Sequence, residues 1–313
     1  MLIQTESKSA VVSESYWSIQ SSPASEKLKI TLPTGRIQEK VLQLLEQVGL
    51  KFLSSGRSYR PVCSDKYIEA KTLKAQNIPA LVALGRHDCG FTGYDWIIEQ
   101  NADIVELLDL GFDPVRIVAA IPEEFVSLSS LAQTITERPL VVASEYRNLA
   151  NIFIKQSGLN AIFVQAYGAT EALPPEDADI VIDNTSSGTT LHHNRLLIVD
   201  ELMQSTTRFI CNKQALEDPA KRARLEELTM LMKSTIEART KVLLEMNFSI
   251  EDFNNLASDL PCMLAPTVSP LYKNKGYVIK IAVPSSDVPR LIPRLVSMGA
   301  RDILEYKLQK IIV

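Results

Sequence analysis

The chain has 313 residues, of which 46% are hydrophobic and 22% are charged, and its formal net charge at neutral pH is −4. This length favours two or three domains with sizeable hydrophobic cores. Because lysine and arginine form no block, nucleic acid is not expected as a partner, and the apolar runs are too short for a membrane span.

The four cysteines lie far apart in the sequence and form no C-x-x-C pair, which indicates neither a zinc site nor a disulfide framework. Reduced thiols, together with the lack of a secretory signal pattern, favour a cytoplasmic protein. Residues 1–27 are rich in serine and show no clear hydrophobic period. We therefore expect them to form a mobile N-terminal extension.

Strands and helices alternate through most of the chain after this extension. Strands are expected at 28–32, 105–110, 115–121, 140–146, 161–164, 180–183, 196–199 and 209–211, with a turn at 33–36. Helices with one apolar face are expected at 37–48, from 96 onward and at 149–157, with Gly49 and Gly158 as stops. This alternation is typical of an α/β fold with parallel sheets.

The last third of the chain has a different character. Asp218 and Pro219 are expected to start a long helix over 219–238, with Asp218 as its N-cap. The order β-α-β-β-α-β is then predicted at 242–248, 250–256, 267–271, 277–283, 288–298 and 302–313. This order predicts a ferredoxin-like, ACT-like domain. The segment contains no histidine and one isolated cysteine, so a regulatory or assembly role fits it better than catalysis.

The segment 180–191 is the strongest candidate for a binding site. An apolar strand leads into Asp183, and the loop after it contains Ser186, Ser187, Gly188, Thr189 and Thr190 before Leu191. Glycine lets the backbone turn closely around an anion, and backbone N–H groups and hydroxyls donate hydrogen bonds to it. An acid at this point can bind a sugar hydroxyl or hold Mg²⁺ that bridges to phosphate. The alternative is an ordinary strand-to-helix turn with hydroxyl caps.

Two further segments suggest ligand contacts. Gly90 and Gly93 lie beside Thr92 and Asp95, a pattern that indicates close approach of the backbone to a ligand, although a simple turn would also explain it. The polar segment 54–65 contains a cluster of charged residues, for which a solvated surface loop is the simpler interpretation.

Eight short motifs occur in a consistent order: LPTGRIQE, SSGRSY, AQNIP, DCGFTGYDW, ELLDLGF, ASEYRNLA, DNTSSGTTL and PCMLAPTVSPL. Together they make the chain resemble the long form of ATP phosphoribosyltransferase, the first enzyme of histidine biosynthesis, from Leu28 to Val313. The resemblance implies a two-lobed α/β core of periplasmic-binding-protein-like (type II) fold. It implies lobe I at 28–117 and 207–239, lobe II at 118–206, and a regulatory domain at 240–313.

The resemblance also implies a reaction and its ligands. Adenine N1 of ATP attacks the anomeric carbon of phosphoribosyl pyrophosphate (PRPP), and pyrophosphate leaves with the help of Mg²⁺. Histidine is expected to inhibit through the C-terminal domain, and the chain is expected to form dimers and hexamers. Because the transition state resembles an oxocarbenium ion, positioning and electrostatics would supply most of the rate, and no general base is needed.

Site residues follow from the matching motifs. Those for PRPP are Asp183, which is also a weak candidate for the metal, and Ser186, Ser187, Gly188, Thr189, Thr190 and Leu191. Those for the nucleotide are Gly35, Arg36, Arg57, Gly93, Tyr94, Asp95, Glu145 and Tyr146. Those for the inhibitor are Ala265 and Thr267. Arg36, Arg57 and Asp183 are the expected catalytic residues, with the arginines neutralising pyrophosphate.

The sequence departs from the family pattern at a few positions. Thr34 stands where lysine is frequent, Lys74 where arginine is frequent, Arg195 where glycine is frequent, and Ala265 where some members have serine. These departures leave two alternatives open. One is a related phosphoribosyltransferase with another acceptor base, and the other is a non-catalytic regulatory or binding subunit.

Overall fold

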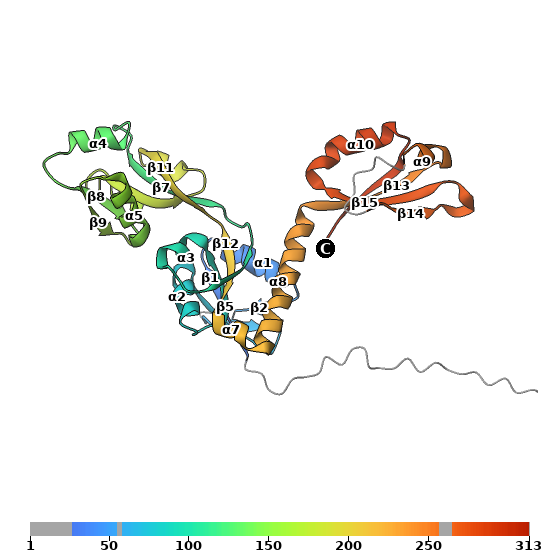
Figure 1. The fold of residues 1–313 in the computed structure, drawn as a ribbon, viewed down its shortest axis with the longest axis horizontal. Helices are drawn as coiled ribbons and strands as arrows, with labels where there is room; N and C mark the ends of the chain where they lie inside the picture. The colour runs from blue at the N-terminus through green and yellow to red at the C-terminus, as the bar shows by residue number, and fades with distance from the viewer. Residues whose placement is uncertain (1–26, 55–57, 257–264, 313) are drawn as a thin grey trace, which may run out of the picture.

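The computed structural model describes residues 27–54, 58–256 and 265–312 (Figure 1). Arg57, Cys262 and residues 1–26 of the expected extension lie outside these ranges. Within them, no helix is both long and apolar enough to cross a membrane. Figure 1 shows three bodies of secondary structure, the last of which is joined to the rest by one long helix.

The first body is built on a five-stranded sheet. Its strands, in spatial order, are β4 (Ile68–Lys74), β1 (Leu28–Thr34), β5 (Cys89–Gly93), β12 (Thr207–Cys211) and β6 (Val105–Asp109). Strand β12 runs antiparallel to both of its neighbours, while β1 pairs in parallel with β4 and β5. A separate hairpin joins β2 (Phe52–Leu53) to β3 (Val62–Cys63).

Helices cover both faces of this sheet. They are α1 (Gln38–Gln47), α2 (Ile78–Ala83), α3 (Tyr94–Gln100), α7 (Lys213–Glu217) and α8 (Pro219–Arg239). Successive residues of β12 point to opposite faces, as the strand period requires. Phe209 and Cys211 belong to a cluster that includes residues of α1 and α8, and Ile210 packs with α2 and α3. The alternating apolar residues therefore fix the helices on each face.

The second body repeats this plan. Its strands, in spatial order, are β11 (Leu196–Ser205), β7 (Val115–Pro122), β10 (Ile180–Thr185), β8 (Leu140–Ser144) and β9 (Ala161–Gln165). Strand β7 is antiparallel to β10 and β11, while β8 pairs in parallel with β9 and β10. The helices are α4 (Leu128–Thr134), α5 (Arg147–Ser157) and α6 (Thr189–His193). The chain crosses between the two bodies after β6 and after β11, so each sheet contains one antiparallel strand.

The two crossing segments lie side by side. The backbone N–H of Leu110 donates to the carbonyl of Thr207 at 3.0 Å, and the N–H of Thr207 donates to the carbonyl of Phe112 at 3.0 Å. The connection between the two lobes is therefore a pair of hydrogen-bonded strands, and the cleft lies beside it.

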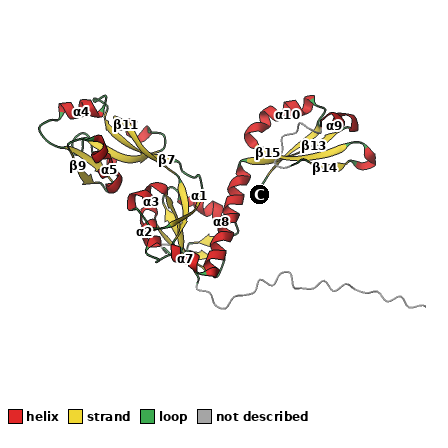
Figure 2. Cartoon of the chain, in the orientation of Figure 1, coloured by secondary structure: helices red, strands yellow, loops and turns green. Residues whose placement is uncertain are grey.

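The third body is the predicted β-α-β-β-α-β unit. It contains β13 (Lys241–Phe248), α9 (Ile250–Leu256), β14 (Thr267–Pro270), β15 (Tyr277–Pro284), α10 (Val288–Ser297) and β16 (Arg301–Lys307). Its sheet has the order β14-β15-β13-β16, with every pair antiparallel. Both helices lie on one side of this sheet (Figure 2). The predicted fold, two α/β lobes followed by a ferredoxin-like unit, is confirmed.

Several predicted boundaries were wrong for physical reasons. The last strand ends at Lys307 rather than Val313, because the chain leaves the sheet and the N–H of Ile311 bonds to the carbonyl of Ser234 in α8. Strand β1 continues through Thr34, so the expected turn begins only at Gly35. Strand β11 continues to Ser205, since its charged residues lie on an exposed edge. Strand β4 and helices α4 and α7 were not predicted.

Candidate active site

Four of the predicted site residues lie at the cleft between the lobes, near the carboxyl ends of strands. Arg36 follows β1, Asp95 follows β5 and Glu145 follows β8. Asp183 lies near the end of β10. In open α/β sheets this edge is where ligands bind, because loops there extend beyond the packed sheet. The sequence prediction that these distant segments form one site is thus compatible with the geometry of both sheets.

A cavity of about 370 Å³, which we call the loop cavity, lies against the segment after β10. Its walls include Arg36 from lobe I and Glu145, Glu171 and Asp183 from lobe II. Ser186, Ser187, Thr190 and Leu191 of the predicted binding loop also line it. A strongly polar cavity of this kind suits a charged, hydroxylated ligand.

The loop itself is held by its own short hydrogen bonds. The N–H of Gly188 donates to Thr185 Oγ1 at 2.9 Å, and Ser187 Oγ lies 2.7 Å from Thr189 Oγ1. Gly188 has φ = 81°, in the left-handed region that favours glycine, and α6 begins directly after it. Leu191 is only 3% exposed and anchors the loop in the apolar cluster below. Among the described residues of the loop, the hydroxyls of Ser186 and Thr190 make no such bond and remain available to a ligand.

Asp183 has an unusual electrostatic environment. Burial, with a smaller contribution from the negative charges of Glu171 and Glu145, raises the pKa of its carboxyl from 3.8 to about 6. A hydrogen bond from the N–H of Asn184 to Asp183 Oδ1 at 2.7 Å opposes this rise. An ionised Asp183 therefore gains from any hydroxyl donor or cation that enters the cavity.

The fit of a divalent cation follows from the same carboxylates. Oxygen ligands of this type are those that Mg²⁺ prefers, and Mg²⁺ is usually held by one or two carboxylates together with substrate phosphates. Within the described ranges, no group of three or more acidic, histidine or cysteine side chains could hold a metal ion. A divalent cation at this site would therefore use one or two of these carboxylates together with oxygens of the ligand.

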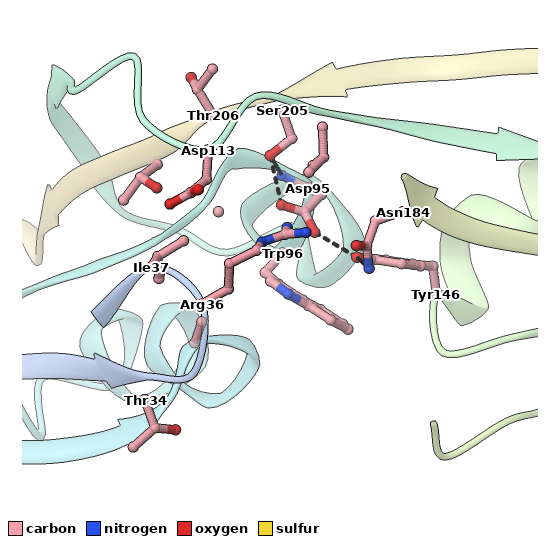
Figure 3. Close-up of a pocket in the computed structure, with 14 residues that line it drawn as sticks. Thr34, Arg36, Ile37, Asp95, Trp96, Asp113, Tyr146, Asn184, Ser205 and Thr206 are labelled. Carbon is pink, nitrogen blue, oxygen red and sulfur yellow. Dashed lines mark hydrogen bonds between the residues drawn. The ribbon is translucent and has the colours of Figure 1, made fainter. Parts of the chain in front are cut away.

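Arg36 is the cation that faces this negative surface. It lines the loop cavity and also a second, smaller cavity of about 170 Å³, which we call the hinge cavity. Its side chain forms no hydrogen bond or ion pair with any described residue. Figure 3 shows it pointing from the loop after β1 into the hinge cavity. A guanidinium that lines two cavities and has no partner in the described part of the chain is well placed for an anionic group of a ligand.

The hinge cavity lies beside the two crossing segments. Its lining includes Thr34, Gly93, Asp95, Trp96, Tyr146, Asn184 and Ser205 (Figure 3). Tyr146 OH donates to Asp95 Oδ2 at 2.7 Å, and Ser205 Oγ donates to Asp95 Oδ1 at 2.6 Å. Burial beside this carboxylate raises the pKa of Tyr146 well above its ordinary value of 10.0, so the phenol stays protonated. Asp95 and Tyr146, both predicted to bind nucleotide, thus contact each other.

The two glycines near Asp95 are also required by close packing within the protein itself. A Cβ at Gly93 would overlap Asp95 Oδ1, and a Cβ at Gly90 would overlap Thr31 Oγ1. The close approach inferred from the sequence is therefore made by side chains of the protein itself. Gly93 still lines the hinge cavity, so a ligand contact of its backbone stays a prediction.

The remaining predicted residues lie farther from these cavities. Tyr94 is half-buried under the guanidinium of Arg208, 4.8 Å from its ring centroid. Ala265 and Thr267 are exposed in the C-terminal unit, at and just before β14. Arg57 lies outside the described residues, and its role stays a prediction.

Sequence reasoning missed several residues that the fold brings to the site. They are Trp96, Glu99, Glu171, Asn184 and Ser205. Asn184 directly follows Asp183 and could have been suspected from that position. Ser205 lies 110 residues from its partner Asp95, and nothing in the local sequence indicates that contact.

Comparison with known proteins decides the family. The family described as ATP phosphoribosyltransferase matches residues 74–234, and the family described as the HisG C-terminal domain matches residues 238–310. An ATP phosphoribosyltransferase of Thermodesulfovibrio yellowstonii is 36% identical over 291 residues, which are 91% of this chain and 98% of that protein. One from Chlorobium chlorochromatii is 38% identical over 91% of this chain and 97% of its own length. The chain belongs to the ATP phosphoribosyltransferase family.

This membership confirms the resemblance inferred from the motifs. As an ATP phosphoribosyltransferase, the protein is a pentosyltransferase of histidine biosynthesis. A chain of the solved ATP phosphoribosyl transferase (HisG:HisZ) complex of Thermotoga maritima supports the fold. It has 24% identity and a TM-score of 0.57, and the match covers 66% of this chain and 98% of that chain.

Proposed function

We propose that the loop cavity binds PRPP and that ATP enters from the hinge cavity, so that N1 of adenine meets the anomeric carbon of PRPP between the lobes. One observation carries this proposal. The guanidinium of Arg36, which has no hydrogen-bond or ion-pair partner among the described residues, shares one cavity with a hydroxyl-rich loop and the desolvated carboxylate of Asp183. The loop matches the 5′-phosphate of PRPP, Asp183 matches the ribose hydroxyls, and Arg36 matches the pyrophosphate leaving group.

The loop after β10 supplies the PRPP contacts in this proposal. Asp183 accepts hydrogen bonds from the ribose hydroxyls, because an ionised carboxylate is a strong acceptor for them. The hydroxyls of Ser186, Ser187 and Thr190 and the backbone N–H groups around Gly188 donate to the 5′-phosphate. Thr189 and Leu191 belong to α6, which follows the loop, and they keep the turn in place.

The chemical step needs charge more than proton transfer. The bond from the anomeric carbon to pyrophosphate breaks as the bond to adenine N1 forms, and positive charge develops on the ribose. Glu145 and Asp183 stabilise that charge, and Arg36, with Arg57, neutralises the departing pyrophosphate. Asp183 is the residue that would hold Mg²⁺, which when bound would further neutralise the charge of pyrophosphate. Adenine N1 is unprotonated near neutral pH and needs no base.

The nucleotide side is formed by residues around the hinge cavity. We assign to it Arg36, Gly93, Asp95 and Tyr146, which line that cavity, and Glu145, which lines the loop cavity. Gly35, Tyr94 and Arg57 are assigned to the nucleotide from the sequence motifs alone. Asp95 and Tyr146 act there mainly by holding the shape of the pocket, since they are already hydrogen-bonded to each other.

Thr34, which also lines the hinge cavity, leaves a second candidate function open. The family often has lysine at this position, so a related enzyme with another acceptor base is the alternative.

Histidine, assembly and compartment complete the proposal. We assign histidine inhibition to the C-terminal unit near Ala265 and Thr267, and we expect a homo-oligomer, a dimer or a hexamer. The alanine at position 265 removes a hydroxyl donor that some members have, so weak inhibition would point to this residue. Cys89 and Cys211 are buried free thiols, which suit the reducing cytoplasm.

The test is a turnover assay with ATP, PRPP, Mg²⁺ and pyrophosphatase, run with and without histidine and with EDTA. We expect phosphoribosyl-ATP to form, EDTA to abolish its formation, and Asp183→Asn to lower kcat/KM for PRPP by at least about 100-fold. Glu217→Gln, an exposed change in α7, is the matched control and should behave as wild type. An Asp183→Asn enzyme with wild-type kinetics would remove PRPP from the loop cavity, and PRPP binding without product from ATP would favour another acceptor.

A further inference from the structure

Helix α3 carries two buried carboxylates on one face. Asp95 is 5% exposed and Glu99 is 7% exposed, and residues four apart on a helix lie one above the other. A buried carboxylate is costly unless its oxygens accept hydrogen bonds. Both side chains point out of lobe I. Ser205, at the end of β11, donates to Asp95 Oδ1, and the partners named below belong to the layers around β8 and β10 in lobe II.

Glu99 caps a helix of the other lobe. Its carboxylate accepts from the N–H of Asn148 at 2.9 and 3.1 Å and from the N–H of Leu149 at 3.0 Å. In return, Asn148 Nδ2 donates to the carbonyl of Glu99 at 2.6 Å. These N–H groups belong to the first turn of α5, where a helix has no partners of its own. The residue at the N-cap position, Tyr146, makes no side-chain capping bond, so the cap comes from across the cleft.

Asp95 makes the second connection from α3. Its carboxylate accepts from Tyr146 OH, and Tyr146 OH accepts in turn from Asn184 Nδ2 at 3.1 Å. The ring of Trp96 stacks on that of Tyr146, with 4.5 Å between centroids. The chain of contacts therefore runs from lobe I through Tyr146 to the residue beside Asp183.

Both connections end next to residues that line the loop cavity. Glu145 lies between the end of β8 and the capped helix α5, and Asp183 precedes Asn184 directly. Their carboxylates cannot keep a fixed place if the backbone beside them shifts. We propose that α3 positions Glu145 and Asp183 from the opposite lobe, with Glu99 as a positioning residue that lines neither cavity and Asn184 as the link to Asp183, which also lines both cavities. This inference rests on the proposed placement of PRPP in the loop cavity.

The test compares Glu99→Ala, Glu99→Gln and Asn184→Ala in the full chain, with Glu217→Gln as the control. Misplacement of a binding group by about 1 Å lowers catalytic efficiency by up to about 100-fold, so we expect Glu99→Ala to raise the KM for PRPP by between 10-fold and 100-fold. The KM for ATP should change less than about threefold, because α3 itself stays in lobe I. Glu99→Gln keeps one neutral acceptor oxygen and should recover part of the loss.

A purely structural role would give a different result. It would lower the temperature of unfolding while leaving the KM for PRPP unchanged at temperatures where each variant is folded. Hydrogen exchange provides a second readout, in which the first-turn amides of α5 should exchange faster in Glu99→Ala and Glu99→Gln than in the control. An unchanged KM for PRPP in both Glu99→Ala and Asn184→Ala, with Asp183→Asn inactive, would overturn the positioning role of α3 and leave the PRPP placement intact. A fully active Asp183→Asn enzyme would overturn the PRPP placement and this inference together.

Discussion

Asp183 shows how a single residue acquires its chemistry from its surroundings. Its pKa rises to about 6 from 3.8 because it is buried near other carboxylates. Between these values the folded protein holds a proton that the unfolded chain has released, so this group makes stability fall as pH rises. At pH 7 the ionised carboxylate costs about 3 kcal/mol of stability, by the free-energy equivalent of a pKa change. Binding of a cation or of hydroxyl donors offsets that cost.

The pH dependence of PRPP binding follows from this shift. If PRPP requires an ionised Asp183, its KM should rise by about tenfold for each pH unit below about 6. The phosphate groups of PRPP titrate in the same range, so Asp183→Asn serves as the control, and its KM should show only the titration of the substrate. Initial rates from pH 5 to pH 8 would measure both curves. Parallel curves for the two proteins would show that Asp183 is not the titrating group.

Arg195 is one of the residues at which the sequence departs from the family pattern, and its backbone conformation bears on that departure. It adopts φ = 55°, in the left-handed region that only glycine occupies without strain. Glycine, which the family pattern predicts at this position, would adopt this backbone at little cost. Arg195 lies in the turn after α6 and is exposed.

At the scale of elements, α8 is the helix that joins lobe I to the C-terminal unit. Asp218 Oδ1 accepts from the N–H of Ala220 at 2.8 Å and from that of Lys221 at 3.2 Å, and Pro219 occupies the first turn. Residues along one stripe of the helix, including Leu225, Leu228 and Met232, are buried in the core of lobe I. The end of the chain returns to this helix. The cap thus stabilises an element that two bodies share.

Removal of that cap should be measurable without loss of catalysis. We expect Asp218→Ala to lower the free energy of unfolding by about 1 kcal/mol, since two backbone N–H groups lose their acceptor. Asp218→Asn keeps an acceptor oxygen and should lose much less. Urea unfolding of both variants, with turnover assays beside it, checks the prediction. An equal loss in the two variants would mean that the charge of Asp218, rather than the cap, stabilises the helix.

At the scale of the whole molecule, the C-terminal unit extends away from the catalytic lobes (Figure 1). Strand β16 is an edge strand of its sheet, and Leu304 and Tyr306 on it are 50% and 43% exposed. An edge strand with exposed apolar side chains is a surface on which another chain can pair. This edge is the part of the molecule that we connect with the expected oligomer.

Sedimentation of the full chain should therefore detect an oligomer, and Leu304→Lys should shift it toward smaller species. The lysine places a charge on the edge strand, where it opposes pairing with a second apolar surface. Leu84→Lys is the matched control, since Leu84 is 72% exposed at the end of α2 in lobe I. A wild-type monomer at all concentrations would contradict the expected assembly. An equal effect of both variants would move the interface away from β16.

The sequence by itself determined what depends on local chemistry. The helix start at Asp218, the β-α-β-β-α-β order and the hydroxyl-rich loop after Asp183 are all visible because capping, periodicity and turn composition act within a few residues. Strand β4 was missed because its charged residues lie on the exposed side and obscure the alternation of Ile68 and Ala70 in the core.

Only the tertiary structure decided which of these segments meet and in what state. Glu99 caps a helix about 50 residues later in the chain, and Asp95 bonds to Tyr146, 51 residues away. The pKa of Asp183 depends on burial and on carboxylates from other loops. Contacts of this kind arise from the order of strands in two sheets and from the way the lobes pack, and no local pattern in the sequence encodes either.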